Sequence, residues 1–199
     1  MLKMEKEYNE LYGHIPSDYE GRLEFMLNDM NLNRAKESVY EYMKRIREIK
    51  WKEISYTLYL LPKATPRPRI GRNGVFYVTG AEDNKKFFRN YLKDQITELI
   101  TTPCKFSCIS YFPIPKSMNN IEKIIAELGF IRPISKPDWD NVAKAYCDMV
   151  QGLLLYDDSL VIEGISKKFY SVKPRIEIKI SYMEDFDSVY NKKKICKKG

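Results

Sequence analysis

Acidic side chains and one lysine gather in a short region of the chain, between residues 136 and 159. They are Asp138, Asp140, Lys144, Asp157 and Asp158. Carboxylates held close together repel one another, and a divalent cation relieves that repulsion. Carboxylate oxygens suit Mg²⁺ or Mn²⁺, and the region lacks the histidine and cysteine pairs of a zinc site. A lysine beside such a site can balance phosphate charge, so the residue types predict metal-assisted phosphodiester hydrolysis.

A short amphipathic helix is the element that must position these groups. Pro137 discourages helical backbone before it, and the side chain of Asp138 suits a helix N-terminus. Because Asp140 and Lys144 are four residues apart, they share one helix face. Apolar residues recur at helical spacing before a glycine that can end the helix; they are Val142, Tyr146, Met149 and Val150, with Gly152 as the stop. If the apolar run that follows folds back, the two aspartates that end it can meet those at the helix start.

Each of these features has a simpler explanation when it is taken alone. Asp138 and Asn141 could only cap the helix. Asp140 and Lys144 could form a surface ion pair. The two consecutive aspartates at 157–158 could belong to a turn. The joint pattern is harder to explain in this way, because it places carboxylates on both sides of a lysine.

The ordered set of residues resembles the signature of the RusA family of Holliday junction resolvases. That signature reads Pro-Asp-x-Asp-Asn-x-x-Lys, then an aspartate within the helix, then Asp-Asp-x-x-Val. The matching residues here are Pro137, Asp138, Asp140, Asn141, Lys144, Asp148, Gly152, Asp157, Asp158 and Val161. The resemblance implies a homodimeric, Mg²⁺-dependent endodeoxyribonuclease that resolves four-way DNA junctions by paired symmetric nicks in recombination and repair. Mn²⁺ is expected to substitute, because oxygen ligands suit either ion. The four cysteines lack the spacing of a disulfide framework, which favours a reduced, cytoplasmic setting, and we expect a bacterial or phage-encoded protein.

The resemblance assigns a role to each matching residue of the acidic region. It makes Asp138, Asp140 and Asp158 metal ligands and catalytic residues, which we call the acid trio. It makes Lys144 the catalytic lysine and Asp157 an accessory ligand. The family usually has an aliphatic residue between the first two aspartates, where this chain has the bulkier Trp139.

Two other classes of function stay open at this point. Another Mg²⁺ nuclease pattern, Pro-Asp followed by Glu-x-Lys, is met loosely by Asp138 with Glu177 and Lys179. However, the spacing is long, and alternation alone would place charges at those two strand positions. A noncatalytic DNA-binding or metal-binding protein is the other class. It has little need for a lysine among the acids, and the residues required for an EF-hand loop are missing.

Positive charge is concentrated outside the first fifty residues. Residues 1–50 hold 9 Lys/Arg and 10 Asp/Glu, so the remaining chain, with 25 and 17, carries a net charge of +8. Four basic residues without an acid follow the first predicted strand; they are Lys63, Arg67, Arg69 and Arg72, which we call the basic loop. The family has a similar Pro-Lys-x-x-Pro-Arg stretch there. The basic loop and Lys136 are therefore predicted to contact DNA phosphates.

The apolar patterns predict an α+β fold, a small mixed β-sheet with covering helices and an N-terminal helical extension. Alternation predicts strands at 53–61 and 104–112, a hairpin of strands at 160–169 and 174–182, and a short hairpin around Asn73-Gly74. Helical spacing predicts helices at 82–101 and 121–128 and several within 1–50. We expect three regions: a helical extension at 1–50, an endonuclease domain at 51–183 and a basic polar tail at 184–199. Cys104 and Cys108 are predicted to be buried in a strand, and no membrane span is expected.

Overall fold

The structure of the chain is a computed structural model, which describes residues 3–64, 69–71, 74–76, 86, 90–92 and 99–184. The chain divides into two compact units, Met1–Ile49 and Lys50–Gly199. In the described part of the chain, no helix is both long and apolar enough to cross a membrane.

The first unit consists of helices, as its apolar spacing predicts. They are α1 (Lys3–Tyr12), α2 (Tyr19–Asp29), a 3₁₀ turn (Asn33–Ala35) and α3 (Lys36–Arg47). Asp18 caps α2 by accepting a hydrogen bond of 2.7 Å from the backbone N–H of Gly21. Lys36 of α3 forms an ion pair of 3.1 Å with Glu24 of α2. Leu27 is buried within this unit.

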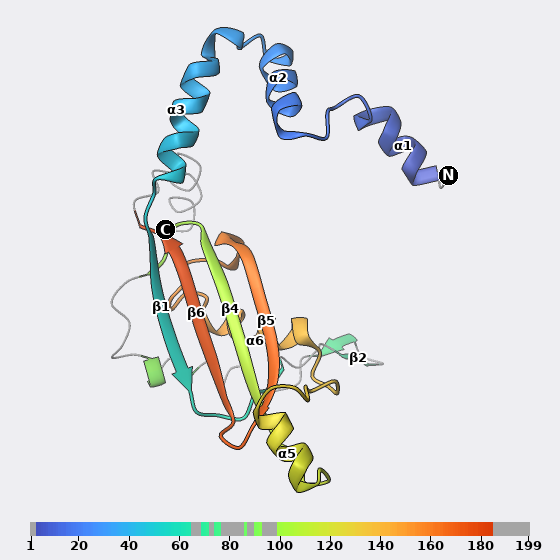
Figure 1. Cartoon of the computed structure of the whole chain (residues 1–199), viewed down its shortest axis with the longest axis vertical. Helices are drawn as coiled ribbons and strands as arrows, with labels where there is room; N and C mark the ends of the chain where they lie inside the picture. The colour runs from blue at the N-terminus through green and yellow to red at the C-terminus, as the bar shows by residue number, and fades with distance from the viewer. Residues whose placement is uncertain are drawn as a thin grey trace. The chain divides into compact units, whose positions relative to one another are not determined.

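The second unit is built on a four-stranded mixed sheet. Its strands are β1 (Trp51–Leu58), β4 (Cys104–Pro113), β5 (Val161–Ser171) and β6 (Arg175–Met183). Their spatial order is β1-β6-β4-β5, as Figure 1 shows. β6 pairs antiparallel with both β1 and β4, whereas β4 and β5 run parallel. The predicted α+β class with a mixed sheet is confirmed.

The predicted hairpin of strands 160–169 and 174–182 is wrong. Both strands form, but β4 lies between β5 and β6 and pairs with each of them. Neighbouring strands lie about 4.8 Å apart, so the link between β5 and β6 must span ~10 Å. Residues 172–174 are enough for that distance when they are extended.

A smaller hairpin is formed by β2 (Arg69–Gly71) and β3 (Gly74–Phe76), with Gly71 opposite Gly74. This confirms the short hairpin predicted near Asn73, which is itself outside the described residues. The helix predicted at 82–101 lies mostly outside them too, as does the predicted tail from 185 onward.

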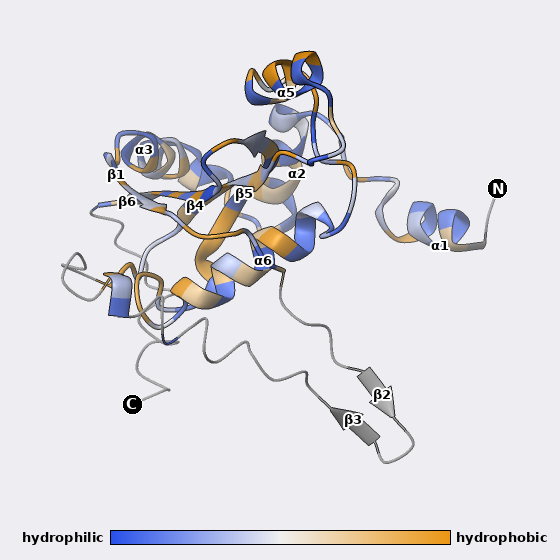
Figure 2. Ribbon diagram, turned by 90° about the horizontal axis from the view of Figure 1, so that it is seen from below, coloured by the Kyte–Doolittle hydropathy of each residue, from blue (hydrophilic) through white to orange (hydrophobic). Residues whose placement is uncertain are grey.

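Helix α6 (Trp139–Val150) covers one face of the four-stranded sheet (Figures 1 and 2). Its buried residues follow helical spacing and are Val142, Ala145, Tyr146 and Val150. They meet the alternate buried residues of the strands, among them Cys104, Phe106 and Cys108 of β4 and Ile176, Ile178 and Ile180 of β6. Burial of Cys104 and Cys108 is therefore confirmed, and burial raises the pKa of their thiols to about 11 and about 12.

Helix α5 (Asn120–Glu127) confirms the helix predicted at 121–128. A capping box begins it, in which Asn119 accepts from the N–H of Glu122 at 2.9 Å and Glu122 accepts from the N–H of Asn119 at 2.8 Å. Its last turn is tied to the sheet, because Glu127 accepts hydrogen bonds from Ser171 and from the backbone N–H of Val172. This anchors the start of the segment that leads to α6.

Candidate active site

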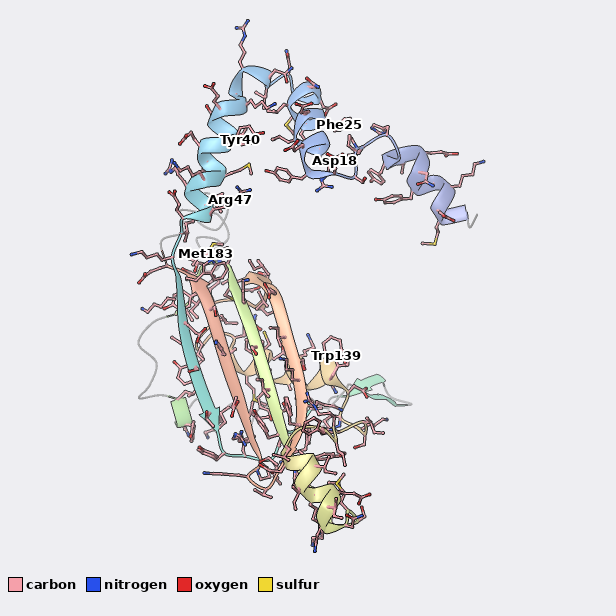
Figure 3. The ribbon with its side chains drawn as sticks, viewed as in Figure 1. Asp18, Phe25, Tyr40, Arg47, Trp139 and Met183 are labelled. Carbon is pink, nitrogen blue, oxygen red and sulfur yellow. The ribbon has the colours of Figure 1, made fainter. Side chains whose placement is uncertain are left out.

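The first two turns of α6 carry most of the residues that the sequence singled out. Asp138 is the N-cap residue, although its side chain makes no capping hydrogen bond. Asp138, Asp140 and Lys144 are exposed, and the helical spacing places Asp140 and Lys144 on the face opposite the buried residues. Trp139 is 63% exposed, and its side chain projects outward beside β5 (Figure 3). The bulky residue at this position therefore takes up no space in the core.

Strand β5 holds the segment that leads into α6. The ammonium of Lys168 donates hydrogen bonds of 2.9 Å to the backbone carbonyls of Ser135 and Pro137. The hydroxyl of Ser166 donates a 2.8 Å bond to the carbonyl of Trp139. The acceptors flank Asp138 on both sides, and the Lys136–Pro137 peptide between them is cis. These two β5 residues were missed by the sequence analysis, because any backbone carbonyl can accept such a bond.

The return from α6 to β5 brings the second acidic pair back to the helix. Gly152 has a φ of +74°, which glycine adopts without strain, and it confirms the predicted helix stop. The buried Leu154 accepts from the N–H of Ile100 at 2.8 Å, which fixes the loop against the core. Asp157 then caps a 3₁₀ turn (Asp158–Leu160), accepting from the N–H of Ser159 at 3.0 Å.

Asp158 lies near the second half of α6, around the thiol of Cys147. Burial, together with the negative charges of Asp158 and Asp148, raises the pKa of Cys147 to about 12, while the positive charge of Lys144 opposes the shift. These four side chains therefore share one neighbourhood. The ammonium of Lys144 lies 4.0 Å from Asp148, so the ion pair in the structure is Lys144–Asp148 rather than Asp140–Lys144.

The acid trio is not gathered in one cluster, because Asp138 and Asp140 lie at the start of α6 and Asp158 lies in the 3₁₀ turn that follows it. Cys147, which Asp158 approaches, is seven residues beyond Asp140, a rise of ~10 Å along the helix axis. Within the described ranges, no group of three or more His, Cys, Asp or Glu side chains is close enough to hold a metal ion. The donor chemistry nevertheless fits Mg²⁺, which is usually held by one or two carboxylates together with water and substrate phosphate.

The basic loop begins beside α6. The backbone N–H of Lys63 donates to the hydroxyl of Tyr146 at 3.1 Å, and the Lys63 side chain is exposed. Burial raises the pKa of Tyr146 to about 12, so this hydroxyl stays protonated. Of the other predicted phosphate contacts, Arg67 and Arg72 lie outside the described residues, and Arg69 is described in its backbone alone, at the start of β2.

Lys136 lies at a small pocket on the approach to α6. The pocket has a volume of about 170 Å³. Its lining is mostly proline and aromatic, and consists of Phe112, Pro113, Pro115, Pro133, Ser135, Lys136 and Tyr170. Lys136 is exposed, and it places a positive charge two residues before Asp138.

The alternative nuclease pattern is not supported by the positions of its last two residues. Glu177 pairs with Arg175 at 2.7 Å and accepts from the hydroxyl of Tyr111. Lys179 pairs with Glu53 at 2.8 Å. Because side chains alternate along β6, both face away from the buried isoleucines that contact α6, and so away from Asp138.

Comparisons with known proteins agree with the resemblance in the acidic region. The family described as endodeoxyribonuclease RusA matches residues 60–181, which include α6, both acidic pairs and Lys144. A relative from Bacillus subtilis (strain 168), the uncharacterized protein YqaN, is 36% identical over 135 residues, which cover 64% of this chain and 94% of that protein. The match spans more than half of the chain and contains every residue of the predicted site from Lys63 to Asp158, so the chain belongs to the RusA family of endodeoxyribonucleases.

Proposed function

We propose that the protein resolves four-way DNA junctions by Mg²⁺-dependent paired nicks, with Mn²⁺ as a substitute. The observation that carries this proposal is the family match across residues 60–181, which includes the whole acidic signature. The exposed polar face at the start of α6 supports it, because a phosphodiester can reach those side chains without disturbing the core.

The acid trio would hold the metal ion, with Asp157 as an accessory ligand. When bound, the ion would supply Lewis-acid stabilisation of the phosphate and favour deprotonation of a water molecule. Hydrolysis joins a water oxygen to phosphorus and breaks one phosphoester bond, and the leaving oxygen takes up a proton. Lys144 is exposed near Asp158 and can neutralise charge on the phosphate as that bond breaks.

A homodimer fits the symmetry of the substrate. A four-way junction has approximate two-fold symmetry, and resolution requires cuts in two opposed strands. A C₂ dimer presents two identical sites at equivalent positions. Lys63 and Lys136 in each protomer, together with the rest of the basic loop, would bind phosphates largely without regard to base sequence.

The decisive test is cleavage of a synthetic four-way junction by the wild-type protein and by Asp140→Asn. We expect paired nicks from the wild type with Mg²⁺, and none after the metal is removed with a chelator. Asp140→Asn should bind the junction at least as tightly, because a negative charge facing phosphate is gone, but it should not cut it. Full nicking by Asp140→Asn would refute the site, and cleavage of plain duplex at an equal rate would refute junction selectivity.

A further inference from the structure

We propose that Lys168 is a positioning residue for the acidic site, aided by Ser166, and that it sets the affinity for the metal ion by fixing the backbone around Asp138. The inference rests on the proposed function, because it assigns a role within that same site. Neither residue belongs to the acidic signature, and both lie on β5, roughly thirty residues further along the chain.

The contacts of Lys168 hold the backbone just before the first carboxylate of the site. Its ammonium bonds the carbonyls of residues 135 and 137, both at 2.9 Å, so one side chain spans the three residues immediately before Asp138. An ammonium has three donors, so Lys168 can hold two carbonyls at once, and charge-assisted bonds are stronger than neutral ones. Rotation of this segment would break both bonds, so the direction of the Asp138 side chain is coupled to Lys168.

Ser166 continues the same attachment on the other side of Asp138. Its bond to the carbonyl of Trp139 reaches the first residue of the helix. Ser166 and Lys168 are two apart on β5, and so they project from the same face of the strand. Together they bond carbonyls on both sides of Asp138, and the strand acts as a rigid support for the start of α6.

The loop that leads to α6 also bonds to β5 through Arg132. Arg132 donates from Nε to the carbonyl of Lys168 at 2.8 Å, and its guanidinium carbon lies 3.3 Å from the centre of the Phe169 ring. Lys168 is therefore bonded through its backbone and its side chain to the same loop. A lysine that served only solubility would not be held at both ends.

The neighbouring Lys167 provides a matched control. It is exposed and projects from the opposite face of β5, and its side chain forms no hydrogen bond or ion pair with the described residues. Lys167→Met and Lys168→Met remove the same charge from adjacent positions. Differences between them report the attachment to residues 135 and 137 rather than net charge.

The first measurement is hydrogen exchange in the protein without metal or DNA. The N–H of Val142 bonds the carbonyl of Asp138 at 3.1 Å, so its exchange reports opening of the first turn. We expect exchange at Val142 to be about tenfold faster in Lys168→Met, from the loss of bonds to a charged donor, and unchanged in Lys167→Met. Equal exchange in the two variants would overturn the attachment.

The second measurement is the affinity for Mn²⁺, followed by electron paramagnetic resonance without DNA. Substitutions that disorder the support of metal ligands typically weaken binding 10–100-fold, and we expect that range for Lys168→Met. Lys168→Arg keeps a charged donor and should recover most of the affinity, and Ser166→Ala should show a smaller loss of the same kind. Faster exchange with unchanged Mn²⁺ affinity would show a purely structural role and refute the proposal.

Failure of the proposed function has a different signature. A wild-type protein that binds Mn²⁺ but cuts no junction would refute junction resolution, while the Lys168→Met affinity would still decide the positioning role. A wild-type protein that binds no Mn²⁺ would refute both. Thermal unfolding of each variant identifies any that fails to fold. If Lys168→Met fails to fold, the Mn²⁺ affinity of Ser166→Ala relative to the wild type decides whether β5 positions the site.

Discussion

Replacing Lys144 tests the catalytic lysine against a simple ion pair. Its ammonium lies 4.0 Å from Asp148, and the two side chains are 67% and 26% exposed. Exposed pairs at this spacing contribute about 0.3–0.5 kcal/mol, and alanine is at least as favourable as lysine within a helix. Lys144→Ala should therefore lower the melting temperature by no more than about 1–2 °C.

The effect on cleavage should be far larger than the effect on stability. Loss of a charge contact made in the transition state costs about 10²–10³-fold in rate. We expect that loss in single-turnover cleavage of a synthetic junction, with junction binding and Mn²⁺ binding close to those of the wild type. Lys144→Arg keeps the charge but changes its reach and donor geometry, and so should recover only part of the rate.

Asp148→Asn separates the two explanations, because it breaks the same ion pair and leaves Lys144 in place. If the pair itself were what matters, both variants would lose the same rate. If the ammonium acts on the phosphate, Lys144→Ala must be slower than Asp148→Asn. Wild-type single-turnover cleavage by Lys144→Ala would show that the lysine is dispensable and that its assigned role is wrong.

Three further predictions concern the surroundings of the site. Neutralising two residues of the basic loop should reduce the slope of log affinity against log salt by about 1.8 on duplex arms, and an unchanged slope would place the loop away from DNA. Tyr146→Phe removes the acceptor for the N–H of Lys63 and should lower the free energy of unfolding by about 0.5–1.5 kcal/mol in urea titrations, with Tyr156→Phe as a comparison at a less buried tyrosine. Burial is the main cause that raises the pKa of Cys147 to about 12, and Asp158→Asn removes a negative charge that adds to this effect. The pKa should therefore fall, and alkylation of Cys147 at pH 9–10, followed by peptide mass spectrometry, should become faster because more thiolate is present; an unchanged rate would contradict the proximity of the two groups.

The acidic helix could be predicted from sequence because its determinants are local. Pro137, the apolar spacing from Val142 and the stop at Gly152 lie within sixteen residues, and each acts on its own backbone. The alternation that predicted β5 and β6 is local as well, and both strands form. Their pairing is not local, because β4 enters between them from more than forty residues earlier.

The link between β5 and β6 lacks the sequence features of a tight hairpin turn. A tight two-residue hairpin turn favours Asn-Gly or a similar pair with positive φ, and the link here is Val172-Lys173-Pro174, which has neither. Proline also removes a ladder donor where β6 begins. The sequence carries no signal for the contacts of Lys168, because they depend on which loop lies beside β5 once the chain has folded.

The strand order also constrains when a newly made chain can fold. In the four-stranded sheet, β1 pairs with β6 alone, and even the closest pair in sequence, Leu58 and Ile176, is 118 residues apart. At about 5–20 residues per second, a ribosome needs roughly 6–24 s to deliver the partner after β1 has emerged. During that interval β1 has no strand to pair with and β4 lacks its partner β6, so the sheet that supports α6 is incomplete. The site on α6 must therefore wait for β6 to be translated, and a chain that terminated before β6 would lack the complete sheet that supports that helix.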